Sequence, residues 1–363
     1  MDRAKSHTHR ATPAARKPPR FVLAAAVLLP CLAAADTPAN LRTNASPAKP
    51  ARRLVLECER DLVAAKRLIP SLEHLPPDAR RFRKLEFTRT PQGPLFLDLY
   101  LLASALGRLP LMVWIHGGGW HTSPTARDDY LPGRMVGRGY ALASIDYRDS
   151  KTARFPAQVQ DCKAAVRWLR AHAEQYGIDP ERVGVWGISA GGHLAAFLGL
   201  SGGEKEFEGD GGNAEFSSRV RAACDFCGPT DLFQLEAPET TNALAALRQM
   251  AEDFVGGKLE DRRDVVAKVN PATHVDPGDP PLLILHGDAD PLIALKQSEL
   301  LYQALKDAGV EVTLGVAKGG SHLFVGPEID RTVDAFFDRH LKVRRPARRQ
   351  RRRQPVRVRQ PAC

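Results

Sequence analysis

The fold is decided by Val183-Gly184-Val185-Trp186-Gly187-Ile188-Ser189-Ala190-Gly191-Gly192-His193-Leu194, a stretch whose pattern changes at its centre. Apolar residues before Ser189 predict a short buried strand, and those after it recur at helical spacing. The turn between them has the pattern G-x-S-x-G, in which glycines let the backbone bend sharply and expose the serine hydroxyl. The hydroxyl would lie at a helix N-terminus, whose dipole favours developing negative charge. Because the pattern is common, other residues must decide whether Ser189 is a nucleophile.

A nucleophilic serine needs a histidine as its base and an acid that orients this histidine. The chain has 11 histidines. We expect the base to be His322, because it lies in a glycine-containing loop between the last expected strand and the last expected helix. His193 is expected to point away along the helix after Ser189, and His286 to pack or to bond backbone. Four further histidines are interpreted as structural: His116, His121, His172 and His274.

The acid is expected in the loop after the strand that ends at Leu285, which contains Asp288 and Asp290. Aspartate is also a favoured helix N-cap, so one of the two carboxylates can instead cap the next helix. The residues alone leave both candidates open. With either of them, the order along the chain is serine, acid, histidine, as in one known arrangement of such triads.

A glycine-rich loop, residues 116–120 (His-Gly-Gly-Gly-Trp), directly follows the apolar run 111–115. Glycines there allow backbone N–H groups to approach the carbonyl of a substrate, with the N–H of Ala190 as a partner. Such glycines can also cradle a phosphate, but no Lys-Ser/Thr pair follows them. The loop therefore predicts an oxyanion hole.

Continuous apolar runs predict strands that are covered on both faces. These runs are residues 111–115, 140–145, 183–186, 220–224, 281–285 and 311–316. Helical spacing is found at 164–173 and 332–341, and a hairpin at the sheet edge is predicted over 85–88 and 95–101. This alternation predicts an α/β fold with a mostly parallel central sheet and helices on both faces. We expect a small helical cap over 232–269 and an amphipathic helix over 53–72.

Residues 80–341 resemble the α/β-hydrolase superfamily, in the carboxylesterase branch that is similar to hormone-sensitive lipase and bacterial feruloyl or acetyl esterases. The resemblance is carried by the motifs at 116–120, 146–148, 187–193, 286–290 and 320–322. It implies the α/β-hydrolase fold, the acid at Asp290 rather than Asp288, and oxyanion donors at Gly118, Gly119 and Ala190. It does not account for the charged stretch 204–219 or for the arginine-rich C-terminus.

The two ends of the chain differ in composition from its body. A basic cluster precedes the apolar run 21–32, and three alanines at 33–35 offer a cleavage site, so residues 1–35 are predicted to be an export signal. An uncleaved anchor or a disordered start is the alternative. Residues 36–79 are interpreted as a linker with an N-terminal helical segment, 80–341 as the catalytic domain, and 342–363 as a disordered tail. The expected location is periplasmic or secreted.

The net charge of +10 equals the ten cations of the tail, Lys342 among them, so the rest of the chain is neutral. A neutral body gives no indication of a specific nucleic-acid groove. The tail is predicted either to contact anionic envelope polymers electrostatically or to have no role. The spacing of Cys224 and Cys227 at a strand end is too long for a disulfide without a turn, so both are expected to be buried thiols.

Together these signals predict a serine esterase that acts on a small-molecule ester through an acyl-enzyme on Ser189, with Asp290 and His322 completing a triad. No metal or organic cofactor is expected. The alternatives are an amidase that resembles kynurenine formamidase and an acetyl or feruloyl carbohydrate esterase. Two others are a non-catalytic binding protein with the same fold and a polymer or nucleic-acid binder that acts through the tail.

Overall fold

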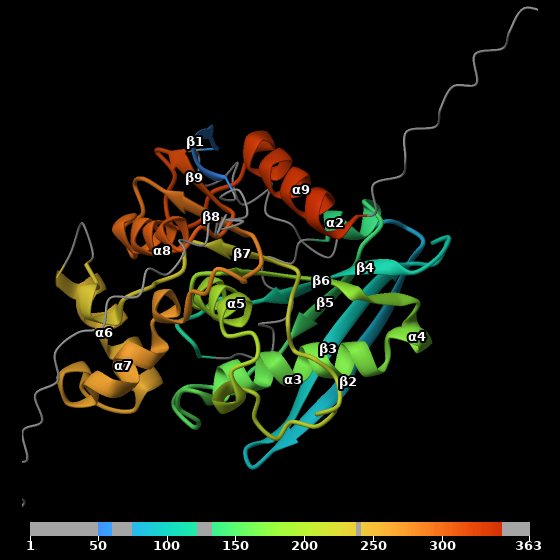
Figure 1. Ribbon diagram of the computed structural model, residues 1–363, viewed down its shortest axis with the longest axis horizontal. Helices are drawn as coiled ribbons and strands as arrows, with labels where there is room; N and C mark the ends of the chain where they lie inside the picture. Colours follow the sequence, from blue (N-terminus) through green and yellow to red (C-terminus); the bar gives the residue numbers. More distant parts are fainter. Residues whose placement is uncertain (1–49, 60–74, 122–132, 237–240, 343–363) are drawn as a thin grey trace, which may run out of the picture. The chain divides into compact units, whose positions relative to one another are not determined.

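The computed structural model describes residues 50–59, 75–121, 133–236 and 241–342. Its strands are β1 (Ala51–Glu57), β2 (Ala79–Thr90), β3 (Gly93–Leu102), β4 (Leu109–Ile115), β5 (Ala141–Ile145), β6 (Ile178–Ile188), β7 (Ala222–Phe226), β8 (Leu282–Gly287) and β9 (Val312–Lys318). They form one nine-stranded sheet in the order β1-β9-β8-β7-β6-β4-β5-β3-β2 (Figure 1). Neighbouring strands are parallel except at β3, which is antiparallel to both β2 and β5. The predicted mostly parallel sheet is confirmed.

The helices in the described residues are α2 (Arg134–Gly137), α3 (Ala157–Ala171), α4 (Ala173–Tyr176), α5 (Ala190–Leu200), α6 (Thr241–Val255), α7 (Arg263–Val269), α8 (Lys296–Asp307) and α9 (Pro327–Leu341). Two hydrophobic cores lie on opposite faces of the sheet. One contains Val166 of α3 and Phe197 of α5, and the other contains Val136 of α2 and Phe337 of α9. Alternate residues of a strand point to opposite faces, so the apolar runs supply both cores. Helices therefore cover both faces, as predicted.

Several predicted elements are shorter than the observed ones. β6 begins at Ile178 rather than 183, α3 begins at Ala157 rather than 164, and α9 begins at Pro327 rather than 332. The missed ends carry polar residues that interrupt the apolar pattern on which the predictions were based. The edge hairpin is present between β2 and β3, with Thr90 opposite Gly93.

The predicted helix over 53–72 is wrong for its first residues, which form strand β1. Leu56 is buried whereas Val55 is 70% exposed, so the residues alternate between two faces with the period of a strand. β1 pairs in parallel with β9, more than 250 residues further along the chain. The sheet thus begins before residue 80, and residues 60–74 lie outside the described part.

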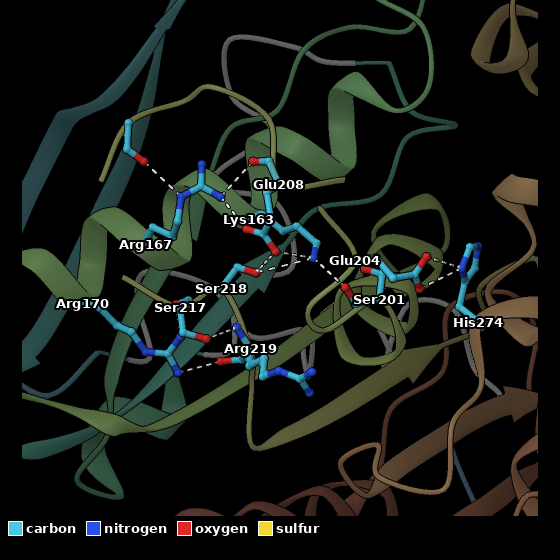
Figure 2. A network of polar contacts seen from close by, with 11 residues as sticks. Lys163, Arg167, Arg170, Ser201, Glu204, Glu208, Ser217, Ser218, Arg219 and His274 are labelled. Atoms are coloured by element: carbon cyan, nitrogen blue, oxygen red, sulfur yellow. Dashed lines mark hydrogen bonds and ion pairs between the residues drawn. The ribbon is translucent and has the colours of Figure 1, made fainter. Parts of the chain in front are cut away.

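The charged stretch 204–219 is held by buried basic residues of α3 (Figure 2). The side chain of Lys163 is fully buried, and its Nζ donates to the carbonyl of Ser201 at 2.7 Å and to Glu208 at 2.9 Å. Arg167 donates to the other carboxylate oxygen of Glu208 at 2.8 Å. Burial raises the pKa of Glu208, but hydrogen bonds from Lys163 and Ser218 outweigh this effect and lower the pKa overall. This segment is therefore packed into the domain by a buried ion-pair network.

The expected cap over 232–269 is helical, because it contains α6 and α7. In the ribbon these two helices lie together at one end of the domain (Figure 1). None of the helices in the described ranges is long and apolar enough to cross a membrane. The predicted signal 1–35 and the tail from residue 343 fall outside those ranges.

Candidate active site

Ser189 stands at the sharp turn between β6 and α5. Its backbone is in an unusual conformation for a residue other than glycine, with φ of 56° and ψ of −123°. A Cβ on Gly187 would overlap the carbonyl of Gly191, and a Cβ on Gly191 would overlap the carbonyl of Ile115. The turn thus closes only because both positions lack a side chain. The N–H of Ser189 donates to the carbonyl of Phe226 at 2.7 Å, which holds the turn against β7.

A cavity of about 420 Å³ opens above this turn. Ser189, His322 and the glycine-rich loop contribute its polar surface. Its other walls are apolar and come from α6, from the end of β6 and from the loops around the sheet edge: Trp120, Ile188, Pro229, Ala243, Ala246, Leu247, Met250, Leu292, Ile293 and Leu323. Cavities that are mostly apolar and have a few convergent polar groups are typical of small-molecule sites.

His322 is bonded to a buried carboxylate. Its Nδ1 lies 2.7 Å from Oδ2 of Asp290, whose side chain is fully buried. The other oxygen of Asp290 accepts the N–H groups of Leu292 and Ile293 at 2.8 and 3.0 Å. Burial raises the pKa of Asp290, but hydrogen bonds from His286 and His322 outweigh burial and hold the pKa well below its ordinary range. Asp290 is therefore an anion fixed behind His322.

Asp288, the other candidate acid, is placed differently. Its side chain is exposed and accepts the backbone N–H of Gly319. The two aspartates thus lie on one loop, but Asp290 alone of the pair contacts His322. Among the described residues no hydrogen bond joins the Ser189 hydroxyl to His322, although both border the same cavity. Such bonds commonly tighten only when substrate is bound.

The glycine-rich loop wraps over the turn at Ser189. Gly118 and Gly119 have φ of 110° and 63°, values that a residue with a side chain rarely adopts. A Cβ on Gly119 would overlap the sulfur of Met250 from α6. Within the described ranges, the backbone N–H groups of Gly118, Gly119 and Ala190 donate to no protein acceptor. Three unpaired donors beside a serine can bind a developing oxyanion.

Three of the other histidines in the described residues have protein partners and do not themselves line the cavity. His116 stacks on Tyr147 with ring centroids 4.3 Å apart, and His274 bonds Glu204 at 3.0 Å. The ring of His193 bonds the side chain of Trp120 and a backbone carbonyl. These contacts agree with the structural roles predicted for these residues.

His286 has a contact that sequence reasoning missed. The prediction that it bonds backbone is confirmed by the 2.8 Å contact of Nε2 with the carbonyl of Ile293. The same nitrogen also lies 3.2 Å from Asp290. The spacing of four residues between His286 and Asp290 was the available signal. The place of Met250 in the cavity wall was also missed, because the sequence of a helix does not indicate which of its faces borders a cavity.

Cys224 and Cys227 are buried free thiols, as predicted. The sulfur of Cys227 donates to the carbonyl of His322 at 3.2 Å. Cys227, Asp290 and His322 offer potential metal-ligand atoms within 4.8 Å of one another. However, Asp290 and His322 bond each other, and burial, followed by the charges of Asp290 and Asp225, raises the pKa of the Cys227 thiol well above its usual value. The group fits a hydrogen-bonded pair with a neutral thiol behind it better than it fits a metal centre.

Comparisons with known proteins point to one family. A family model described as BD-FAE matches residues 97–305, more than half of the chain. Esterase LipQ of Mycobacterium tuberculosis is 31% identical over 247 residues, which are 66% of this chain and 57% of LipQ. The chain thus spans little more than half the length of this curated relative.

Solved structures agree with this match. A truncated form of a carbohydrate esterase from gut microbiota superposes with a TM-score of 0.65 and 29% identity, over 74% of this chain and 99% of that one. The esterase Est2 of the planctomycete Thermogutta terrifontis has a TM-score of 0.58 and 26% identity, over 76% and 96% of the two chains. The fold predicted from the sequence motifs, that of the α/β-hydrolases, is confirmed.

Proposed function

Because the chain belongs to the BD-FAE family and has an α/β-hydrolase fold, we propose that it hydrolyses carboxylic esters through an acyl-enzyme on Ser189. One observation carries the proposal. Ser189 and His322 border a single cavity, and behind His322 lies the buried, anionic Asp290. A hydroxyl, an imidazole and a carboxylate in this arrangement can activate the hydroxyl for attack on a carbonyl.

In the first half of the reaction, Oγ of Ser189 attacks the ester carbonyl carbon while His322 accepts the hydroxyl proton. The carbonyl electron pair moves onto oxygen and forms a tetrahedral oxyanion. Collapse of this intermediate breaks the bond to the alcohol, which leaves with the proton from His322. Asp290 keeps a proton on Nδ1 of His322 and stabilises the imidazolium, so that the other ring nitrogen can accept and return protons.

In the second half, water attacks the acyl carbon while His322 accepts a proton from this water. The bond from the acyl carbon to Oγ then breaks, Oγ of Ser189 takes the proton from His322, and the acid is released. The backbone N–H groups of Gly118, Gly119 and Ala190 stabilise the oxyanion in both halves. Among the described residues these N–H groups donate to no protein acceptor, which supports this role. No step requires a metal or an organic cofactor.

The apolar walls support an ester whose acyl or alcohol part is aliphatic or aromatic, since sugars would leave their hydroxyls without partners on such walls. An acetyl or feruloyl ester of a carbohydrate is the second candidate. It is favoured by the likeness to a carbohydrate esterase, and it requires only the acyl group to enter. The relatives named above are esterases, which favours esters over the amide bond of a formamidase substrate.

The test is a panel of p-nitrophenyl esters, acetylated and feruloylated sugars and N-formylkynurenine, assayed with the purified full-length protein. Ser189→Ala should abolish turnover of every substrate that the unmodified protein cleaves, and should also abolish labelling by a fluorophosphonate. Turnover by the Ala variant at the original rate would refute the acyl-enzyme. Cleavage of N-formylkynurenine in preference to all esters would favour the amidase.

The cellular location and the role of the tail are also proposals. The composition of residues 1–35 supports export, and the ten cations of the tail support electrostatic contact with anionic envelope polymers. Fractionation of cells and N-terminal sequencing of the mature protein would test export. Loss of retention on anionic polymer after removal of residues 343–363 would test the tail.

A further inference from the structure

Trp120 closes the glycine-rich loop and is held at several points. It is 1% exposed and has a left-handed φ of 60°. Its ring stacks almost parallel on Phe254 of α6, with centroids 4.4 Å apart. Its carbonyl accepts the N–H of Ser150 at 3.0 Å. Its indole N–H donates to Nδ1 of His193, on the helix that begins after Ser189, at 3.2 Å.

The partner of Nε2 of His193 determines whether Nδ1 of the same ring donates or accepts a hydrogen bond. Nε2 lies 2.9 Å from the carbonyl of Val269, at the end of α7. A carbonyl can only accept, so Nε2 carries the hydrogen. An indole N–H can only donate, so Nδ1 must present a lone pair. Both bonds exist together only for the neutral imidazole with hydrogen on Nε2.

Burial favours this neutral form. The His193 ring is fully buried, and burial lowers its pKa to about 4. At the pH values used for esterase assays the imidazole is uncharged, and it keeps one tautomer because its two partners have opposite requirements. His193 is thus a rigid acceptor for Trp120. With both nitrogens engaged, it is not available as a proton-transfer base.

The loop needs such support because three successive residues, Gly118, Gly119 and Trp120, have positive φ. A run of this kind costs free energy, about 1–2 kcal/mol at the non-glycine position, and persists only where contacts on each side determine it. Trp120 supplies those contacts, and His193 fixes the rotation of the indole. Without the bond from Trp120 to His193, the end of the loop would be held less firmly. The stacking on Phe254, the bond from Ser150 and the bond from the N–H of His121 to the carbonyl of Gly118 would remain.

We propose that His193 is a positioning residue for the esterase reaction: through the indole of Trp120 it holds the N–H groups of Gly118 and Gly119 where the oxyanion develops. The proposal rests on the function proposed above. Loss of the bond should displace donors that act in the transition state, so kcat should fall while KM changes little.

The test compares two substitutions of one residue. His193→Phe keeps a ring of similar size and removes both nitrogens, and kcat for p-nitrophenyl acetate should fall roughly 10-fold to 100-fold, with KM within about threefold. In His193→Asn the amide oxygen lies as many bonds from the backbone as Nδ1, so it restores the acceptor for Trp120. This variant should recover most of kcat although it loses the bond to Val269.

A double-mutant cycle supplies the control. Trp120→Phe removes the indole N–H but keeps a ring against Phe254, and it should reproduce the loss of kcat seen in His193→Phe. The double variant should lose no more than either single variant, because both remove the same bond. If His193→Phe does not fold, Trp120→Phe alone decides the question by the same split between kcat and KM.

Three results would each overturn the proposal. The first is full kcat in the folded Phe variants, and the second is an equal loss of kcat in His193→Phe and His193→Asn. The third is losses of kcat that multiply in the double variant. Ser189→Ala, assayed alongside, separates this outcome from failure of the proposed function. If Ser189→Ala is inactive and the His193 variants are fully active, only the positioning role is wrong. If Ser189→Ala is active, the esterase mechanism itself is wrong.

Discussion

Replacing Asp290 with asparagine should nearly abolish catalysis without unfolding the domain. The amide has the shape of the carboxylate, but one of its two ends donates hydrogen bonds. The oxygen is required at the end that accepts the N–H groups of Leu292 and Ile293. The NH₂ group must therefore face Nδ1 of His322, 2.7 Å away in the unmodified protein.

The size of the effect follows from the tautomer of His322. An amide N–H can bond Nδ1 only if this nitrogen is unprotonated, so the imidazole hydrogen moves to Nε2, the nitrogen that accepts the Ser189 proton in the proposed mechanism. A base in the wrong tautomer, which also lacks an anion to stabilise its imidazolium, loses about 10⁴-fold in kcat. This loss corresponds to roughly 5.4 kcal/mol in the activation free energy.

The assay is the steady-state hydrolysis of p-nitrophenyl acetate, with thermal unfolding as the check on folding. Asp288→Asn is the matched control, because it is the same substitution two residues away on the same loop. The Asp288 side chain is exposed and bonds only the N–H of Gly319 among the described residues, so kcat should stay within about twofold.

The tautomer argument would be refuted if Asp290→Asn kept kcat within tenfold of the unmodified protein and its unfolding profile were unchanged. A larger loss in Asp288→Asn than in Asp290→Asn would show that the acid has been assigned to the wrong carboxylate.

Three further predictions concern other parts of the molecule. Gly118→Ala should lower kcat roughly 100-fold with a smaller change in KM, because alanine rarely adopts a φ of 110° and a donor would be displaced; a change in KM alone would mean that the loop only binds substrate. Glu208→Gln should lower the free energy of unfolding, measured in urea, by about 2–4 kcal/mol, because it leaves the buried ammonium of Lys163 without its anion. Lys163→Met should lower it by less, and the reverse order would contradict the ion-pair network. Because the pKa of Glu208 is lower in the folded state, the charged side chain should stabilise the fold at pH values above its usual pKa of 4.5. This stabilisation should be lost as the pH falls through the folded-state pKa, and Glu208→Gln should show no such loss. Deletion of 343–363 should leave kcat/KM for a neutral ester unchanged, and a large loss of activity or of Tm would show that the tail docks on the domain.

Local sequence pattern was sufficient for the central part of the fold. A strand, a G-x-S-x-G turn and a helix follow one another around Ser189, and each is specified by residues within a few positions of it. Buried parallel strands are uniform apolar runs, so they are readable without knowledge of their neighbours. The same applies to part of the loop 116–120, where Gly118 and Gly119 are required by their own backbone angles.

Where a contact joins distant segments, only the folded chain decided the outcome. Leu54 and Leu56 are predicted to lie in a helix because apolar residues recur at helical spacing over the longer stretch 53–72. Two residues apart, they fit a strand, and pairing with β9 makes them one, since an edge strand satisfies its backbone groups on a partner that sequence spacing cannot show. Asp288 and Asp290 are equivalent as residues, and the path of one loop places Asp290 against His322. For His193 the sequence indicated only a ring that points away from Ser189. Its bond to Trp120 exists because packing brings together α5, α7 and a loop more than 70 residues upstream, so that one buried imidazole meets a donor on one side and an acceptor on the other.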